Sequence, residues 1–127
     1  MEVDVCDPRV TLEGVRELLG ATVLCAGDLS KKVDAVLAAD LMSDVLTMGG
    51  PGMLLLTGLA SVQTVRTAAI ADLVGVVLIG GKKPGDEVVS LARAEQVSLL
   101  STPMSMFQAA GVLYRTIPTG EERCGAR

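Results

Sequence analysis

The sequence predicts a three-layer α/β domain, in which helices flank both faces of a mainly parallel sheet. The chain has 127 residues, a length that suits one domain with one core. Hydrophobic residues make up 50% of it, but the aromatic ones are only Phe107 and Tyr114. An aliphatic core of this kind is typical of parallel strands that are buried on both faces. From residue 40 onward, short apolar runs alternate with helical patterns, which indicates βαβ units.

The first elements form a helix and two strands. Residues 11–20 predict a helix that Thr11 caps and Gly20 ends, because its apolar residues recur at helical spacing. The apolar runs at 21–27 and 33–40 predict strands. Since the link between them is short, we expect this pair of strands to be antiparallel.

The remaining elements alternate regularly. Strands are expected at 53–58, 74–80 and 97–103, and helices at 41–49, 61–73, 85–96 and 104–116. Ser61 is a suitable cap for the second of these helices. The acids Asp86 and Glu87 suit the first turn of the third, since the helix dipole favours negative charge there.

Composition and charge argue against several classes of function. The net charge is −4, without the clustered bases or exposed aromatics that nucleic-acid binding needs, and no basic patch suits an anionic membrane. The apolar runs at 53–59 and 73–79 are far shorter than the ~20 residues that cross a bilayer. The N-terminus begins with acids, unlike a signal peptide, so we expect a soluble cytoplasmic protein.

The reactive residues are few. Cys6, Cys25 and Cys124 are scattered and histidine is absent, so we expect no metal site, no cofactor and no nucleophile with a base beside it. Cys25 lies in an apolar run and is interpreted as a core residue, whereas Cys124 lies in a polar tail. We therefore expect that the chain is not an enzyme.

The stretch VVLIGGKKPGDE at 76–87 could either hold an anion or form a simple turn. It is not a P-loop, because the lysines follow Gly80 and Gly81 directly and no Ser or Thr comes after them. Asp86 and Glu87 at the start of the next helix would also repel an anion. The favoured interpretation is a strand-to-helix turn with solvated lysines, and a weak anion site at Lys82 is the alternative.

The run DLMSD places Asp40 and Asp44 four residues apart. On one helix face, two carboxylates at this spacing could hold Mg²⁺ or act as an acid and base pair. The favoured interpretation is simpler: Asp40 or Ser43 caps the short helix, and Asp44 stabilises its first turn.

Polar residues gather where the parallel strands are expected to end, which is where ligands bind in such sheets. A nucleotide or small anion could be held there by hydroxyls, amides and one cation. The candidate ligand-binding residues are Asp40, Ser43, Asp44, Thr57, Gly58, Ser61, Gly80, Gly81, Lys82 and Thr102.

Residues 11–115 resemble the DRTGG domain family. The resemblance rests on DLMSDVL, on the strand end LLLTG, on the alanine-rich helix after it, and on the LIGG…P turn, although the literal string DRTGG does not occur. That family is similar to the N-terminal domain of HPr kinase, which lacks the kinase active site. It also occurs in phosphotransacetylases and, beside CBS pairs, in some inorganic pyrophosphatases.

The resemblance implies a free-standing, non-catalytic regulatory or protein-interaction domain that acts as a homodimer, with a protein partner that the sequence does not name. Residues 1–10 would form an N-terminal extension and 116–127 a polar tail. Phe107 and Tyr114 are seven residues apart on the last helix and are interpreted as core or dimer contacts. The alternative is a sensor that binds a nucleotide or small anion at the carboxyl ends of the strands.

Overall fold

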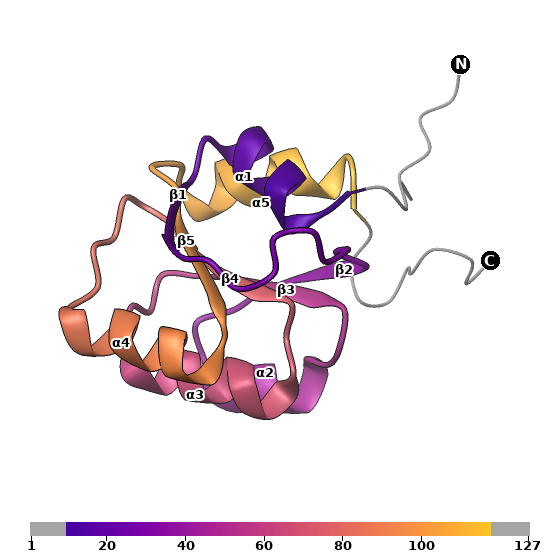
Figure 1. The fold of residues 1–127 in the computed structure, drawn as a ribbon. Coiled ribbons are helices and arrows are strands. Elements are labelled where there is room, and N and C mark those ends of the chain that lie inside the picture. Colours follow the sequence, from indigo (N-terminus) through magenta and orange to yellow (C-terminus); the bar gives the residue numbers. More distant parts are fainter. Residues whose placement is uncertain (1–9, 118–127) are drawn as a thin grey trace, which may run out of the picture.

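The computed structural model describes residues 10–117 and contains a sheet between two layers of helices (Figure 1). The predicted N-terminal extension up to residue 9, the tail from residue 118, Cys6 and Cys124 lie outside the described residues. The elements follow in the order α1 (Leu12–Leu19), β1 (Thr22–Cys25), β2 (Ala35–Ala38), α2 (Met42–Met48), β3 (Met53–Thr57), α3 (Val62–Ala71), β4 (Gly75–Leu78), α4 (Asp86–Glu95), β5 (Ser98–Ser101) and α5 (Met106–Tyr114).

The sheet has five strands in the order β1-β5-β4-β3-β2. Strands β2 to β5 are parallel to one another, and β1 pairs with β5 in the antiparallel sense. The prediction of a mainly parallel sheet is therefore confirmed.

The expected pairing of the first two strands was wrong, although β1 and β2 do run in opposite directions. They lie at opposite edges of the sheet. The linker of residues 26–34 crosses between those edges along the amino ends of the parallel strands. Nine extended residues span up to ~30 Å, whereas four strand spacings amount to ~19 Å. A link that is short in sequence is thus long enough to cross the whole sheet.

Each face of the sheet buries its own core. Helices α1 and α5 cover one face and α2, α3 and α4 the other (Figure 1). Successive side chains of a strand point to opposite faces, so Leu55 joins the core under α3 while Leu54 and Leu56 join the core under α1 and α5. Every residue of β3 is buried, as expected for a central parallel strand.

Local signals in the sequence set the helix ends. The hydroxyl of Thr11 accepts a hydrogen bond from the Gly14 amide, and Ser61 caps α3 in the same way, as predicted. Gly20 ends α1 in the left-handed conformation with φ of 59°. Helix α5 starts with a capping box of Ser105 and Gln108, which the sequence interpretation did not identify.

Several apolar side chains remain at the surface. Cys25 is buried in the core, as predicted. Of the two roles expected for Phe107 and Tyr114, core or dimer contacts, the core role is excluded, since they are 89% and 61% exposed. Both project from the side of α5 that faces away from the sheet, where the spacing of seven residues keeps them on one face. Met48 at the end of α2 is also exposed, at 57%.

Candidate functional site

At the carboxyl edge of the sheet, the structure brings Asp40, Thr57 and Gly58 together. The Thr57 hydroxyl donates a hydrogen bond of 2.9 Å to the Asp40 carboxylate, and the Gly58 amide donates one of 2.8 Å to the same oxygen. These bonds lower the pKa of Asp40 below its usual value, first through Gly58 and then through Thr57, with a smaller contribution from the charge of Lys82. Asp40 is therefore an ionised hydrogen-bond acceptor at this edge.

The capping role predicted for Asp40 or Ser43 was wrong. Helix α2 begins at Met42 after Leu41, and no side chain caps it. Asp40 lies outside the helix and bonds to the β3–α3 loop instead, so it does not share a helix face with Asp44. The buried hydroxyl of Thr57 needs a partner, and Asp40 supplies it. Ser43 and Asp44 are exposed in the first turn of α2, where Asp44 was expected.

The glycines of the VVLIGGKKPGDE stretch form a tight turn, with φ of 73° at Gly80 and 68° at Gly81. The Gly80 amide donates to the carbonyl of Met104 at 2.7 Å, and the Gly81 amide donates to that of Thr102 at 2.8 Å. The hydroxyl of Ser101 donates to the Lys82 carbonyl at 2.8 Å. Both glycine amides are thus occupied by the β5–α5 loop, and the exposed lysines are what the turn offers to an anion.

Two other predicted hydroxyls have structural partners. Thr102 is buried, and its hydroxyl donates to the Leu19 carbonyl at 2.6 Å and accepts from the Met104 amide at 3.2 Å. Ser61 accepts from the Thr64 amide as the cap of α3. Part of the predicted set therefore lies along one edge of the sheet with its polar atoms bonded within the protein, namely Asp40, Thr57, Gly58, Ser61, Gly80, Gly81 and Thr102. Ser43 and Asp44 lie apart from these contacts on the exposed first turn of α2.

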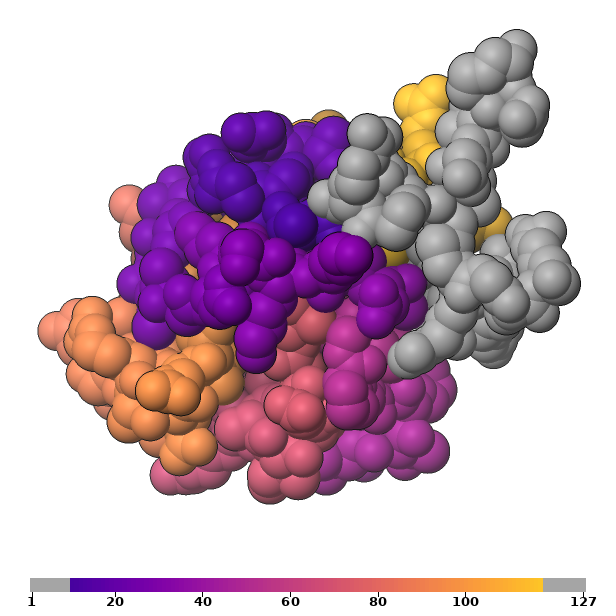
Figure 2. Space-filling view, turned by 45° about the vertical axis from the view of Figure 1, so that its right-hand side comes forward, coloured from indigo at the N-terminus to yellow at the C-terminus, as the bar shows by residue number. Residues whose placement is uncertain are grey.

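Two cavities lie at the opposite, amino edge of the sheet, and neither is lined by a predicted site residue. They have volumes of about 140 Å³ and about 520 Å³. Figure 2 shows this face, where the purple linker of residues 26–34 meets the orange of α4 and the salmon end of α3. The sequence interpretation missed this edge because it placed β1 and β2 side by side. The linker then had no reason to cross the starts of β4 and β5.

Within residues 10–117, no group of three or more His, Cys, Asp or Glu side chains is placed to hold a metal ion. Among the same residues, no helix combines the length and the apolar character that crossing a membrane requires.

Comparisons with known proteins agree with this architecture. The model of the DRTGG domain matches residues 14–116. The fold is similar to the crystal structure of the CBS and DRTGG domains of the regulatory region of Clostridium perfringens pyrophosphatase, complexed with its activator diadenosine tetraphosphate. The TM-score is 0.71 and the sequence identity 14%, and the match covers 100% of this chain and 56% of that one. This chain thus spans about half the length of that regulatory region. No curated protein sequence matches significantly.

Proposed function

Because this chain belongs to the DRTGG domain family, a family of regulatory domains, we propose that it is a non-enzymatic regulatory module that acts as a homodimer. A protein partner or small ligand would favour one arrangement of the dimer, and the shift could be no larger than its differential affinity for the two arrangements. The observation that carries this proposal is the outer face of α5.

The outer face of α5, formed by Phe107, Gly111 and Tyr114, is suited to pairing with another helix. Phe107 and Tyr114 are 89% and 61% exposed. Gly111 is also exposed, and a side chain added there would meet no atom within 4 Å. Residues spaced by four and three positions fall on one stripe of a helix. The stripe therefore has two large aromatic groups with a gap between them.

A stripe of this kind is complementary to a copy of itself. In an antiparallel pair of α5 helices, a two-fold axis near Gly111 places Phe107 of each copy against the Tyr114 end of the other. Glycine lets the two helix backbones approach closely at the axis. A glycine inside an exposed helix lowers the stability of that helix by up to about 1 kcal/mol relative to alanine. A close contact between two helices at Gly111 would explain why a glycine occupies this position. Aromatic anchors of this type dominate the binding energy of many interfaces.

The pair of variants Phe107→Glu and Ile70→Glu tests the interface. Ile70 is 74% exposed on α3, in the opposite helical layer, and so makes a matched control. Sedimentation velocity should show a dimer for the unaltered chain and for Ile70→Glu, and a monomer for Phe107→Glu. If Phe107→Glu remains dimeric, or if Ile70→Glu alone dissociates, the interface does not lie on α5.

The proposal that the chain is not an enzyme is supported by the two carboxylates that the sequence offered as an acid and base pair, Asp40 and Asp44. Asp40 has its pKa lowered by hydrogen bonds, which makes it a poor acid or base near neutral pH. Asp44 is exposed on α2. Neither residue lines one of the two cavities.

Nucleotide or anion sensing at the carboxyl edge is the second candidate function. It is favoured by the exposed Lys82 and Lys83 beside the helix N-termini, and by the nucleotide activator named for the similar pyrophosphatase region. The affinity for an anion is limited by repulsion from the carboxylates of Asp40, Asp86 and Glu87 at the same edge. The occupied amides of Gly80 and Gly81 weaken it further.

Thermal unfolding in the presence of diadenosine tetraphosphate and inorganic phosphate tests this second candidate. A ligand at 100 times its Kd adds about 2.7 kcal/mol of stability, which raises the melting temperature measurably. For a sensor, the rise should disappear in the double variant Lys82→Glu, Lys83→Glu. An unchanged melting temperature in the original chain would remove this candidate and leave the dimer proposal standing.

A further inference from the structure

Strand β2 forms one edge of the sheet and directs part of its backbone away from its neighbour. It is the last strand in the order β1-β5-β4-β3-β2, so in the described part of the chain its strand partner is β3 alone. The Ala39 amide donates to the Leu56 carbonyl of β3 at 3.0 Å. Because successive residues of a strand direct their backbone groups to opposite sides, the N–H and C=O groups of Val36 and Ala38 point away from β3. These are the groups to which a further strand would bond.

The residues of β2 do not protect this edge from pairing. Edge strands are usually protected by charged side chains, proline or bulges. The sequence of β2 is AVLA, which contains neither a charge nor a proline. At the opposite edge of the sheet, the register of β1 shifts between Val23 and Cys25, and a bulge of this kind hinders pairing. The edge at β2 is therefore the one suited to an added strand.

The chain already pairs with the segment that leads into β2. Thr11 lies opposite Lys32 in an antiparallel bridge, and the Val33 amide donates to the Val10 carbonyl at 3.0 Å. In an antiparallel pairing, each residue further toward the N-terminus lies opposite a residue further along the partner strand. Val10 is the first residue that the structure describes. A continuation of this pairing would place the residues before Val10 along the open part of the edge.

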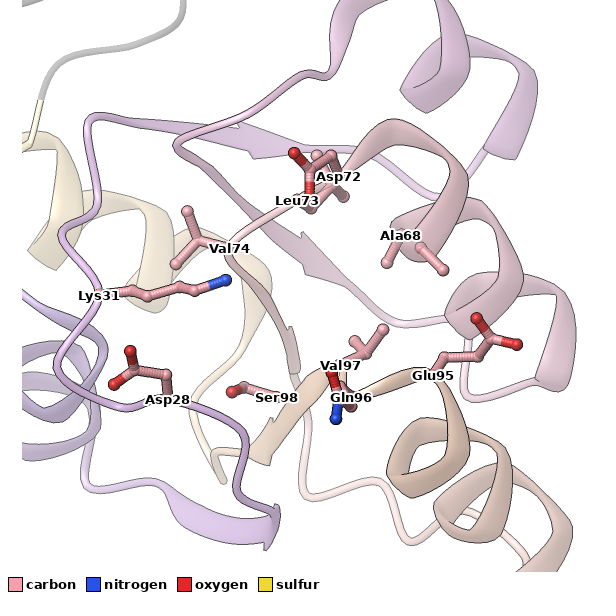
Figure 3. A pocket seen from close by; sticks show the side chains of 11 residues that line it. Asp28, Lys31, Ala68, Asp72, Leu73, Val74, Glu95, Gln96, Val97 and Ser98 are labelled. Atoms are coloured by element: carbon pink, nitrogen blue, oxygen red, sulfur yellow. The ribbon is translucent and has the colours of Figure 1, made fainter.

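The linker of residues 26–34, which leads into β2, is anchored to the sheet. Its Gly27 amide donates to the Ser98 hydroxyl at the start of β5, at 3.0 Å. Figure 3 shows the Lys31 side chain extending from the linker toward Val74, which immediately precedes β4. The edge is therefore in place before a strand is added to it, which lowers the entropic cost of pairing.

The sequence before Val10 suits an edge strand. Residues 2–6 read EVDVC, in which β-branched valines alternate with acids. Such alternation is typical of a strand with one face toward solvent. Seven extended residues, 3–9, span up to ~25 Å, whereas the four residues of β2 span about 13 Å. The segment is therefore long enough to cover the strand.

Proline at position 8 is compatible with this arrangement. The amides of Asp34 and Ala39 both donate to β3, although an odd number of positions separates them. The alternation of the backbone is thus interrupted once at the start of β2, as in a bulge. In the continued pairing Pro8 falls near this point, and proline is tolerated on edge strands and at bulges.

We propose that residues 3–7 of this chain add to β2 as a sixth, antiparallel strand and so close this edge of the sheet against pairing with other chains. These residues are a better occupant than the tail of residues 118–127, because they continue a pairing that begins at Thr11 and Val10. The inference does not depend on the homodimer, since the outer face of α5 points away from the sheet, or on an anion site. Each can fail without the others.

Hydrogen exchange of the backbone amides, followed by NMR on the full chain, tests the proposal within a single strand. The amides of Leu37 and Ala39 point to β3 and serve as internal references for those of Val36 and Ala38. In the unaltered chain, the amides of all four residues should exchange slowly, because strands would lie on both sides of β2.

The double variant Val5→Pro, Cys6→Pro removes two successive amide donors, so one of them faces β2 in either register. Exchange at Val36 and Ala38 should become at least about tenfold faster in this variant. The rates at Leu37 and Ala39 should stay unchanged, which also shows that the variant is folded.

The matched control is Glu121→Pro, Glu122→Pro, which places the same two prolines in the polar tail and should leave the exchange rates of β2 unchanged. Fast exchange at Val36 and Ala38 in the unaltered chain would overturn the proposal, because the edge would then be open. Slow exchange that persists in Val5→Pro, Cys6→Pro, or that is lost in the tail variant instead, would also overturn it, because another segment would then cover β2.

Discussion

The carboxylate of Asp40 accepts a hydrogen bond from the Thr57 hydroxyl at 2.9 Å and thereby joins the end of β2 to the end of its neighbour β3. The same carboxylate oxygen accepts from the Gly58 amide, and the Thr57 hydroxyl in turn accepts from the Leu59 amide at 3.2 Å. A residue that resembled a helix cap in the sequence therefore organises the loop that leads into α3.

The substitution Asp40→Ala should lower the free energy of unfolding by about 1–2 kcal/mol, because it leaves the buried Thr57 hydroxyl and the Gly58 amide without their acceptor. Urea unfolding at pH 7 measures this. Asp44→Ala, which removes an exposed carboxylate from the first turn of α2, should cost about 0.3–1 kcal/mol. Equal losses in the two variants would contradict a special role for Asp40.

The difference in stability between the original chain and Asp40→Ala should depend on pH. The folded protein holds the pKa of Asp40 below its ordinary value, so the carboxylate stabilises the fold above that ordinary value. The contribution is lost as the pH falls through the lowered pKa. The difference should therefore be full at pH 7 and shrink from about pH 5 downward. A difference that stays constant or grows on acidification would show that ionisation of Asp40 does not matter.

Asp72→Gly should stabilise the fold by about 0.5–1 kcal/mol, since glycine relieves the left-handed strain but adds backbone entropy to the unfolded chain. Ala71→Gly, one residue earlier and at the last position of α3, should instead destabilise it by up to about 1 kcal/mol. Thermal and urea unfolding measure both.

Gly80→Ala and Gly14→Ala should have opposite effects on stability. Space is open at Gly80, but its φ of 73° is strained for alanine, so a loss of about 1–2 kcal/mol is expected. A side chain on Gly14 would meet the Thr11 hydroxyl at an ordinary 3.8 Å within α1, so alanine should add about 0.5–1 kcal/mol. Equal shifts in the two unfolding midpoints would contradict this interpretation of the turn.

The sequence predicts the order and type of the elements well, because those features depend on local signals. The largely apolar strand β3 and the caps Thr11 and Ser61 each follow from a few neighbouring residues. The position of β1 in the sheet does not follow from neighbouring residues. A nine-residue linker permits either a hairpin or a crossing of the sheet, and only packing of β1 beside β5 decides between them.

The candidate sites show the same division. The carboxyl-edge residues could be found because parallel strands place their ends together, yet the partner of Asp40 lies 17 residues away in sequence. The two cavities at the amino edge depend on where the linker crosses, so Asp28 and Lys31 gave no signal of them in the sequence. Exposure of Phe107 and Tyr114 depends on which side of α5 meets the sheet. Apolar residues such as Ala109 and Leu113 compete with them for that side, and the structure buries those two instead.

The mass of the unaltered chain in solution, measured by light scattering during size-exclusion chromatography across a range of concentrations, tests the proposed homodimer most directly. The outer face of α5 predicts a mass of twice the 13.1 kDa of one chain, with a shift toward one chain on dilution. A mass of 13.1 kDa at every concentration would contradict the homodimer and leave the aromatic stripe to a different partner.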